Sequence, residues 1–189
     1  MFKKVLAVAA VAIFSLGLTA CGSSTPTDQV TEDLEAVKAE NVEKTMEEAF
    51  ATNEELDEAY QADYEAFAKK VQEFDYEIGE EKISDDGNTA TVEVKFTTYP
   101  FGEAYTEVYN QVIADAQSGK ITADTDINAY VMEALFKGLS ALEDKSYKAT
   151  VTVNCTKDEN GNWKSDIDSS DEVQDAVFGG MYTAISNAV

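Results

Sequence analysis

Two stretches in which apolar and polar residues alternate constrain the fold more than any other feature of this sequence. The first covers residues 90–96 and the second residues 147–155, with an apolar side chain at every second position. Successive side chains of a strand point to opposite faces, so this pattern predicts strands with one buried and one solvated face. The turn-forming segment at 85–88 precedes the first stretch and the segment at 157–161 follows the second. The sequence therefore predicts two β-hairpins.

Elsewhere, apolar residues recur every three or four positions, which is the spacing of amphipathic helices. Five such segments begin near residues 30, 52, 101, 124 and 170. Two helices, a hairpin, two helices, a hairpin and a last helix predict an α+β fold, in which a curved four-stranded antiparallel sheet packs against about five amphipathic helices. Gly179 and Gly180 interrupt the last helix. Each costs about 1 kcal/mol relative to alanine there, so we expect close packing at these glycines, or otherwise a kink.

The amino terminus has the layout of a secretory signal peptide. Lys3 and Lys4 precede an apolar run that extends from Val5 to Leu18, which is shorter than the roughly 20 apolar residues that span a bilayer. The following Leu18-Thr19-Ala20-Cys21 resembles the lipobox of bacterial lipoproteins. The resemblance implies cleavage after residue 20 and a diacylglyceryl group on Cys21. An ordinary signal peptide and an uncleaved anchor are the alternatives.

This interpretation divides the chain into three parts. Residues 1–20 form the signal peptide, residues 21–29 a flexible polar tether, and residues 30–189 a single α+β domain. A lipidated Cys21 would hold the domain on the outer face of the cell membrane, because two acyl chains anchor a protein durably where one binds only marginally.

Charge excludes several classes of function. The chain carries 14 basic and 37 acidic residues, a formal net charge of -23, and no histidine. Nucleic acid is not an expected partner, because affinity for phosphates depends on cationic contacts. Without histidine, and with Cys155 as the only thiol beyond Cys21, we expect no metal site, no cofactor and no disulfide within the domain. Cys155 lies in the apolar register of its strand, which predicts a buried, inert side chain.

The closing hairpin and last helix provide a family resemblance. Asp158-Glu159-Asn160-Gly161-Asn162-Trp163-Lys164 leads through Ser169-Ser170-Asp171 to Phe178-Gly179-Gly180. Together with the lipobox and the acidic pair of helices, this part resembles a family of uncharacterised lipoproteins of low-GC Gram-positive bacteria. The resemblance implies a cystatin-like or nuclear-transport-factor-2-like domain, in which a curved sheet wraps helices. It implies no reaction.

We therefore expect a non-catalytic binding module for a small or apolar ligand or for an envelope partner. Its candidate ligand-binding residues are four aromatic side chains beside a groove between the sheet and the helix that begins near Asn53: Tyr64, Phe67, Tyr105 and Trp163. The alternative is a structural or interaction protein in which the same rings fill a packed core. An enzyme that uses paired carboxylates is less favoured, because in a chain with 37 acidic residues no particular pair is informative. The sequence predicts no oligomeric state.

The lipobox leads to a direct prediction. Replacement of Cys21 by alanine removes the sulfur that would be acylated, so Cys21→Ala should abolish lipidation and leave the precursor uncleaved by the lipoprotein peptidase. Metabolic labelling with a fatty-acid analogue, followed by electrophoresis, measures both effects. Equal label on the wild type and the variant would contradict the lipoprotein interpretation.

Overall fold

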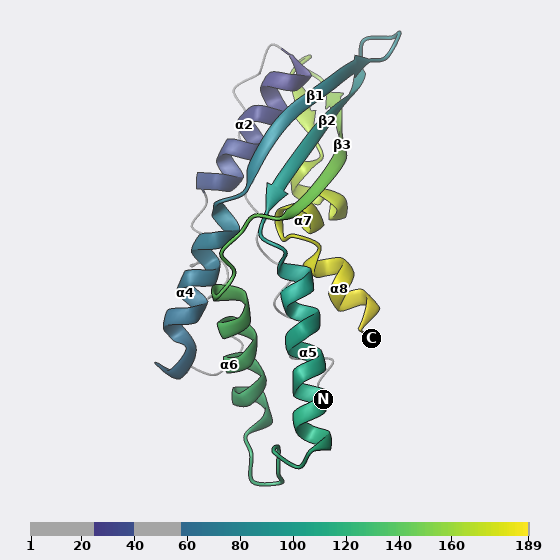
Figure 1. The fold of residues 1–189 in the computed structure, drawn as a ribbon. Coiled ribbons are helices and arrows are strands. Elements are labelled where there is room, and N and C mark those ends of the chain that lie inside the picture. The colour runs from purple at the N-terminus through teal and green to yellow at the C-terminus, as the bar shows by residue number, and fades with distance from the viewer. Residues whose placement is uncertain (1–24, 40–57, 189) are drawn as a thin grey trace.

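The computed structural model describes residues 25–39 and 58–188 and has an α+β fold, as the sequence predicts (Figure 1). The described residues form six α-helices, a short 3-10 helix and one four-stranded antiparallel sheet of order β1-β2-β3-β4. In chain order the elements are α2 (Pro26–Ala39), α4 (Glu58–Gln72), β1 (Asp75–Ile83), β2 (Thr89–Thr98), α5 (Phe101–Gln117), α6 (Ile127–Ser140), β3 (Tyr147–Lys157), β4 (Trp163–Ser165), η2 (Ile167–Ser169), α7 (Asp171–Val177) and α8 (Met181–Asn187).

The sheet has one apolar and one polar face, because the alternation predicted for β2 and β3 is kept in register across the pair. Val92 lies opposite Val153 and Val94 opposite Val151, and all four side chains are buried. The intervening threonine, lysine and glutamate residues face solvent. An antiparallel sheet with this pattern requires a cover on one side only.

Two helices that are far apart in the sequence provide this cover. Helix α2 packs across β1, β2 and β4, and α7 packs on β2 and β3. Val30 and Leu34 of α2 and Val173 of α7 are fully buried. The apolar stripes of both helices therefore share one core with the sheet.

Helices α4, α5 and α6 extend this core beyond the end of the sheet (Figure 1). Their contact is aromatic: the ring of Phe67 meets that of Phe101 edge-on at 5.2 Å between centroids, and Phe136 lies 6.2 Å from Phe67. Helix α4 packs chiefly against α6, whereas α5 contacts both α6 and α8.

Two predicted boundaries differ from the structure. Helix α2 begins at Pro26, so residues 26–29 of the predicted tether are helical and Gln29 is buried. Proline is favoured at the first helical position, and the backbone and side chain of Thr27 both donate to Glu81 of β1. Strand β4 stops at Ser165, and Ile167 instead lies in η2. Cys21, the predicted helical segment from residue 40 to 50, and the predicted helix start near Asn53 lie outside the described residues.

The predicted last helix is divided into α7 and α8, because the glycine pair both packs closely and bends the chain. Gly179 and Gly180 have φ of 54° and 80°, in the left-handed region that favours glycine. A Cβ atom on Gly179 would lie 1.9 Å from the carbonyl oxygen of Tyr99, and one on Gly102 would lie 2.4 Å from that of Gly180. The backbone N–H of Gly102 donates to the carbonyl oxygen of Gly179 at 3.0 Å.

This contact makes a prediction about stability. In Gly179→Ala the new Cβ atom would overlap the carbonyl oxygen of Tyr99. The substitution should therefore lower the free energy of unfolding by about 1–3 kcal/mol more than a glycine substitution without that contact. Gly87→Ala is the matched control, since Gly87 also has a positive φ, 70°, but nothing would lie within 4 Å of its Cβ. Urea unfolding followed by the fluorescence of Trp163 measures both variants. Equal losses would show that the close contact does not limit stability.

Candidate functional site

The four aromatic residues predicted to bind a ligand are buried. Tyr64 and Phe67 are each 1% exposed. They lie together on α4, where Tyr64 meets Phe136 of α6 edge-on with ring centroids 5.2 Å apart. Side chains so completely covered contact the protein and offer almost no surface to a ligand, which is the arrangement of the packed-core alternative.

The structure places Tyr105 and Trp163 on other elements. Tyr105, on α5, is buried and stacks on Tyr109 at 6.3 Å between ring centroids. Trp163 begins β4, is buried, and has the ammonium of Lys157 at 4.7 Å from its ring centroid. The pair on α4, the ring on α5 and the indole on β4 thus belong to three different parts of the core.

An open groove instead lies between α5 and the α7–α8 turn, on residues that the sequence did not single out for binding. Its volume is about 810 Å³, within the range of small-molecule sites. Small residues line its base: Gly102, Gly179, Gly180, Ala184 and Ala188. The glycine contact described above joins the start of α5 to the α7–α8 turn, and the Tyr109 hydroxyl donates to the carbonyl oxygen of Ala188 at 3.4 Å at the end of α8, so the two sides of the groove are held together at two places.

Polar side chains form the walls. Successive turns of α5 contribute Glu103, Thr106, Glu107 and Asn110. Helix α8 contributes Thr183 and Asn187. These positions are exposed and follow helical spacing along a face that the apolar stripe leaves to solvent. A sequence pattern could mark that face as polar. It could not show that a second helix stands opposite.

Three carboxylates line the groove, and no lysine is among the described residues that line it. The carboxylate of Asp175 is fixed by Thr183, whose backbone N–H and hydroxyl donate to its two oxygens at 3.0 and 2.7 Å. Burial, and then the charge of Asp175, raises the pKa of Tyr147, so this phenol at the groove stays neutral. Most of the surface that lines the groove is apolar, and three carboxylates, two tyrosine rings and amide groups add polar contacts.

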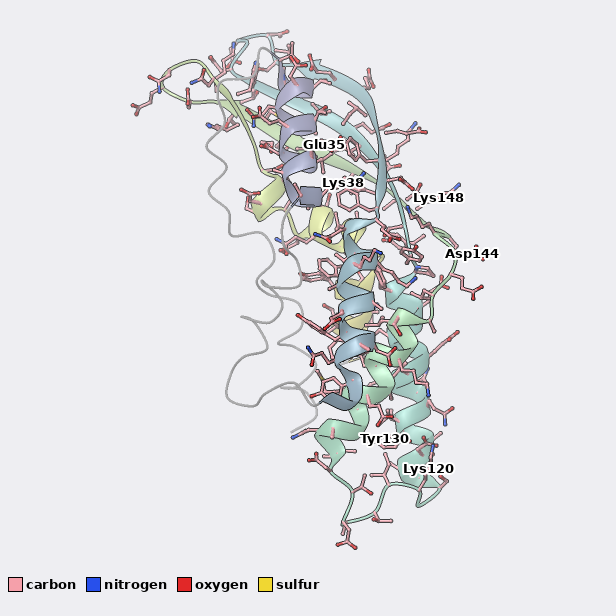
Figure 2. All side chains as sticks on the ribbon, turned by 90° about the vertical axis from the view of Figure 1, so that its left-hand side faces the viewer. Glu35, Lys38, Lys120, Tyr130, Asp144 and Lys148 are labelled. Atoms are coloured by element: carbon pink, nitrogen blue, oxygen red, sulfur yellow. The ribbon has the colours of Figure 1, made fainter. Side chains whose placement is uncertain are left out.

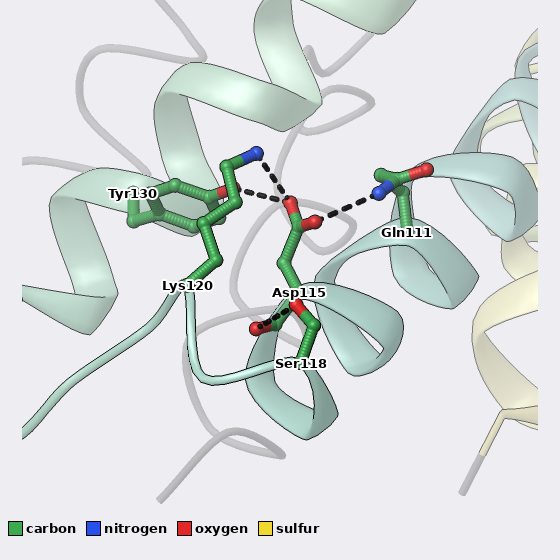
Figure 3. A network of polar contacts seen from close by, with 5 residues as sticks. All are labelled: Gln111, Asp115, Ser118, Lys120 and Tyr130. Atoms are coloured by element: carbon green, nitrogen blue, oxygen red, sulfur yellow. Dashed lines mark hydrogen bonds and ion pairs between the residues drawn. The ribbon is translucent and has the colours of Figure 1, made fainter.

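A second polar cluster closes the connection between α5 and α6 (Figure 3). The Asp115 carboxylate accepts hydrogen bonds from Gln111 Nε2 at 2.9 Å, from Lys120 Nζ at 2.8 Å and from the hydroxyl of Tyr130, while Ser118 donates to its backbone carbonyl. The Lys120 ammonium, and then the Tyr130 hydroxyl, holds the pKa of Asp115 below its usual range. The donors lie on α5, on the loop that follows it and on α6, so the cluster stabilises the connection between these two helices.

Polar contacts of this kind occur at both ends of the molecule, near Asp115 at one end and on α2 at the other. Figure 2 shows Lys120 and Tyr130 at the end remote from the sheet, and Glu35 and Lys38 on α2 beside the sheet. There the hydroxyl of Tyr76 donates to Glu35 at 2.6 Å, and Lys38 lies 5.4 Å from the centroid of the same ring. These contacts join α2 to β1, and we assign them a structural role.

A third cluster is buried beneath α2. Asp33 is 2% exposed, and its carboxylate accepts from Gln29 Nε2 at 2.8 Å and from the Ser165 hydroxyl at 2.6 Å. Burial raises the pKa of Asp33, and burial together with the charge of Asp33 raises that of Asp168. The cluster ties α2 to β4 at the cost of enclosing a charge.

The described residues offer little reactive chemistry. Burial raises the pKa of the Cys155 thiol to about 12, and the charge of Asp166 adds to the effect, so the thiol is protonated near neutral pH. Within 25–39 and 58–188, no three histidine, cysteine, aspartate or glutamate side chains are grouped so that they could hold a metal ion. In the same ranges, no helix has the length and apolar character needed to cross a membrane.

Comparison with known proteins gives a distant structural similarity. No protein-family model matches the sequence, and no curated protein matches it. A solved structure, described as that of a "putative lipoprotein (ycdA)" from Bacillus subtilis, is similar with a TM-score of 0.43 and 14% sequence identity. The alignment covers 93% of this chain and 54% of that chain, so this chain spans about half the length of that protein. The similarity is too low to transfer a site or a function, and the cystatin-like or nuclear-transport-factor-2-like assignment stays a prediction.

The buried Asp33 predicts a pH dependence. A carboxyl whose pKa is higher in the folded than in the unfolded state contributes most stability below its unfolded value, here 3.8. That contribution is lost as pH rises through the folded value. Asp33→Asn removes the enclosed charge but keeps hydrogen-bonding groups, an amide oxygen and an amide nitrogen, for Gln29 and Ser165. Its free energy of unfolding relative to the wild type should therefore increase from acidic to neutral pH.

Asp33→Ala is the control, because it leaves Gln29 and Ser165 without their buried partner. An unsatisfied buried polar group costs about 1–3 kcal/mol, so this variant should be destabilised at every pH. Urea unfolding at a series of pH values above the isoelectric point measures both variants. If Asp33→Asn loses as much stability as Asp33→Ala at neutral pH, the carboxylate charge is favourable and the expected sign is wrong.

Proposed function

We propose that this protein is a lipid-anchored lipoprotein on the outer face of the cell membrane, and that it binds a partner in the groove between α5 and α8 without catalysing a reaction. The observation that carries the proposal is the groove itself. Its base is made of backbone and small side chains that close packing holds in place. A rigid, preformed surface binds at a lower entropic cost than one that must be ordered first.

The sequence between the lipobox and α2 supports the membrane location. Only four residues separate Cys21 from Pro26, where α2 begins. A fully extended chain covers at most about 3.6 Å per residue, so a lipidated Cys21 would keep the start of α2 within roughly 20 Å of the bilayer surface. A groove on such a domain would meet partners in the membrane or close to it.

The chemistry of the chain supports a binding role over a catalytic one. The sequence contains no histidine, and Cys155 is buried with a pKa of about 12, whereas a nucleophilic cysteine requires a lowered pKa and access. The groove carboxylates Glu103 and Glu107 are exposed to solvent. Exposed carboxylates of this kind suit the binding and orientation of charged groups.

Site-specific photocrosslinking tests the proposal in the native envelope. A benzoyl-phenylalanine at Asn110, which lines the groove and is exposed, should form a discrete crosslinked product. The same residue at Ala116 is the control, because Ala116 is exposed on the same helix but six residues further along, which turns it roughly 120° away from Asn110. No product at Asn110, or the same product at both positions, would contradict the proposal and favour the packed structural protein.

A further inference from the structure

The charge distribution within the groove indicates what could occupy it. Glu103 and Glu107 lie one turn apart on α5, and both are exposed. Neither forms an ion pair with a lysine of the described residues. Glu103 lies in the first turn of α5, where the helix dipole favours a carboxylate, whereas Glu107 faces a like charge one turn away. Asp175 adds a third carboxylate from α7, and each of its oxygens retains a lone pair after bonding to Thr183.

The remaining walls suit an extended cationic segment. The groove follows α5 from Gly102 to Asn110, about 12 Å at 1.5 Å per residue. An extended peptide advances about 3.3 Å per residue, so roughly four residues fit along it. The rings of Tyr109 and Tyr147 line the same groove, and aromatic faces bind the ammonium or guanidinium groups and the apolar stems of lysine and arginine.

Other occupants from the chain itself are disfavoured by charge. Residues 40–57 carry seven carboxylates against one lysine, and a second copy of the chain brings a formal net charge of -23. An acidic segment would meet an acidic groove. A basic segment would be attracted by the whole protein, since a charge of one sign concentrates ligands of the opposite sign and accelerates their association.

We infer that the groove between α5 and α8 recognises a short extended peptide segment that carries lysine or arginine residues, presented by a protein of the cell envelope. This inference rests on the proposed binding function and specifies its partner. Glu103 and Glu107 bind the cationic side chains directly, Asp175 supplies a fixed charge at the α7 end, and Asn110 provides amide groups for the backbone of the peptide.

Fluorescence anisotropy with the full-length lipidated protein in a non-ionic detergent tests the inference. The probe is a fluorescein-labelled hexapeptide of alternating lysine and alanine. The double variant Glu103→Gln/Glu107→Gln should weaken its binding at least tenfold. The matched control is Glu65→Gln/Glu133→Gln, which changes the net charge equally at two exposed positions on α4 and α6. The control should change the affinity less than twofold.

Each other result overturns the inference in a recognisable way. Equal weakening by the groove and control variants would assign binding to the general acidic surface. Displacement of the peptide by spermidine at equal concentration would identify a small polyamine site in place of a peptide site. If the lysine peptide does not bind while the Asn110 crosslink forms, the groove has a partner of another class. If the crosslink is absent as well, the proposed binding function itself fails.

Discussion

The close backbone contact between the start of α5 and the α7–α8 turn is the constraint on which the rest of the structure depends. The amide of Gly102 donates to Gly179, and the absence of a side chain at Gly102 and Gly179 lets two backbone segments, 99–102 and 179–181, approach closely. Because Tyr99 directly follows β2, the same contact joins the sheet to the helical extension. It also places the start of α8 against α5, and the groove lies between these two helices.

The carboxylates discussed above fall into two groups according to whether the chain supplies hydrogen-bond donors to them. Asp115 and Asp33 are surrounded by donors from their own chain and connect neighbouring elements. Glu103 and Glu107 have solvent on one side and an acidic neighbour on the other. Groups of the first kind join elements of the fold, whereas Glu103 and Glu107 are left to solvent and gain favourable interactions when a cation binds. This contrast supports a binding role for the groove.

Much of the fold could be predicted because periodicity is local. The alternation in β2 and β3 and the stripes of α5 and α6 identify strands, helices and their buried faces without reference to the rest of the chain. The errors occur where an element depends on a distant partner. Helix α2 begins at Pro26 because Glu81 of β1 holds its first turn, and the predicted last helix divides because backbone from residues 99–102 lies against it.

The sequence by itself determined the α+β class, the one-sided sheet, the acidic charge and the predicted lipid anchor, since each follows from composition or from neighbouring residues. Only the tertiary structure decided which aromatic rings are core and where a groove lies. Tyr64 and Trp163 have the apolar register of either a core or a pocket wall, and burial alone distinguishes the two. The groove joins exposed positions of α5 to the glycine turn about 75 residues later, and no local pattern records which surfaces will stand opposite when the chain folds.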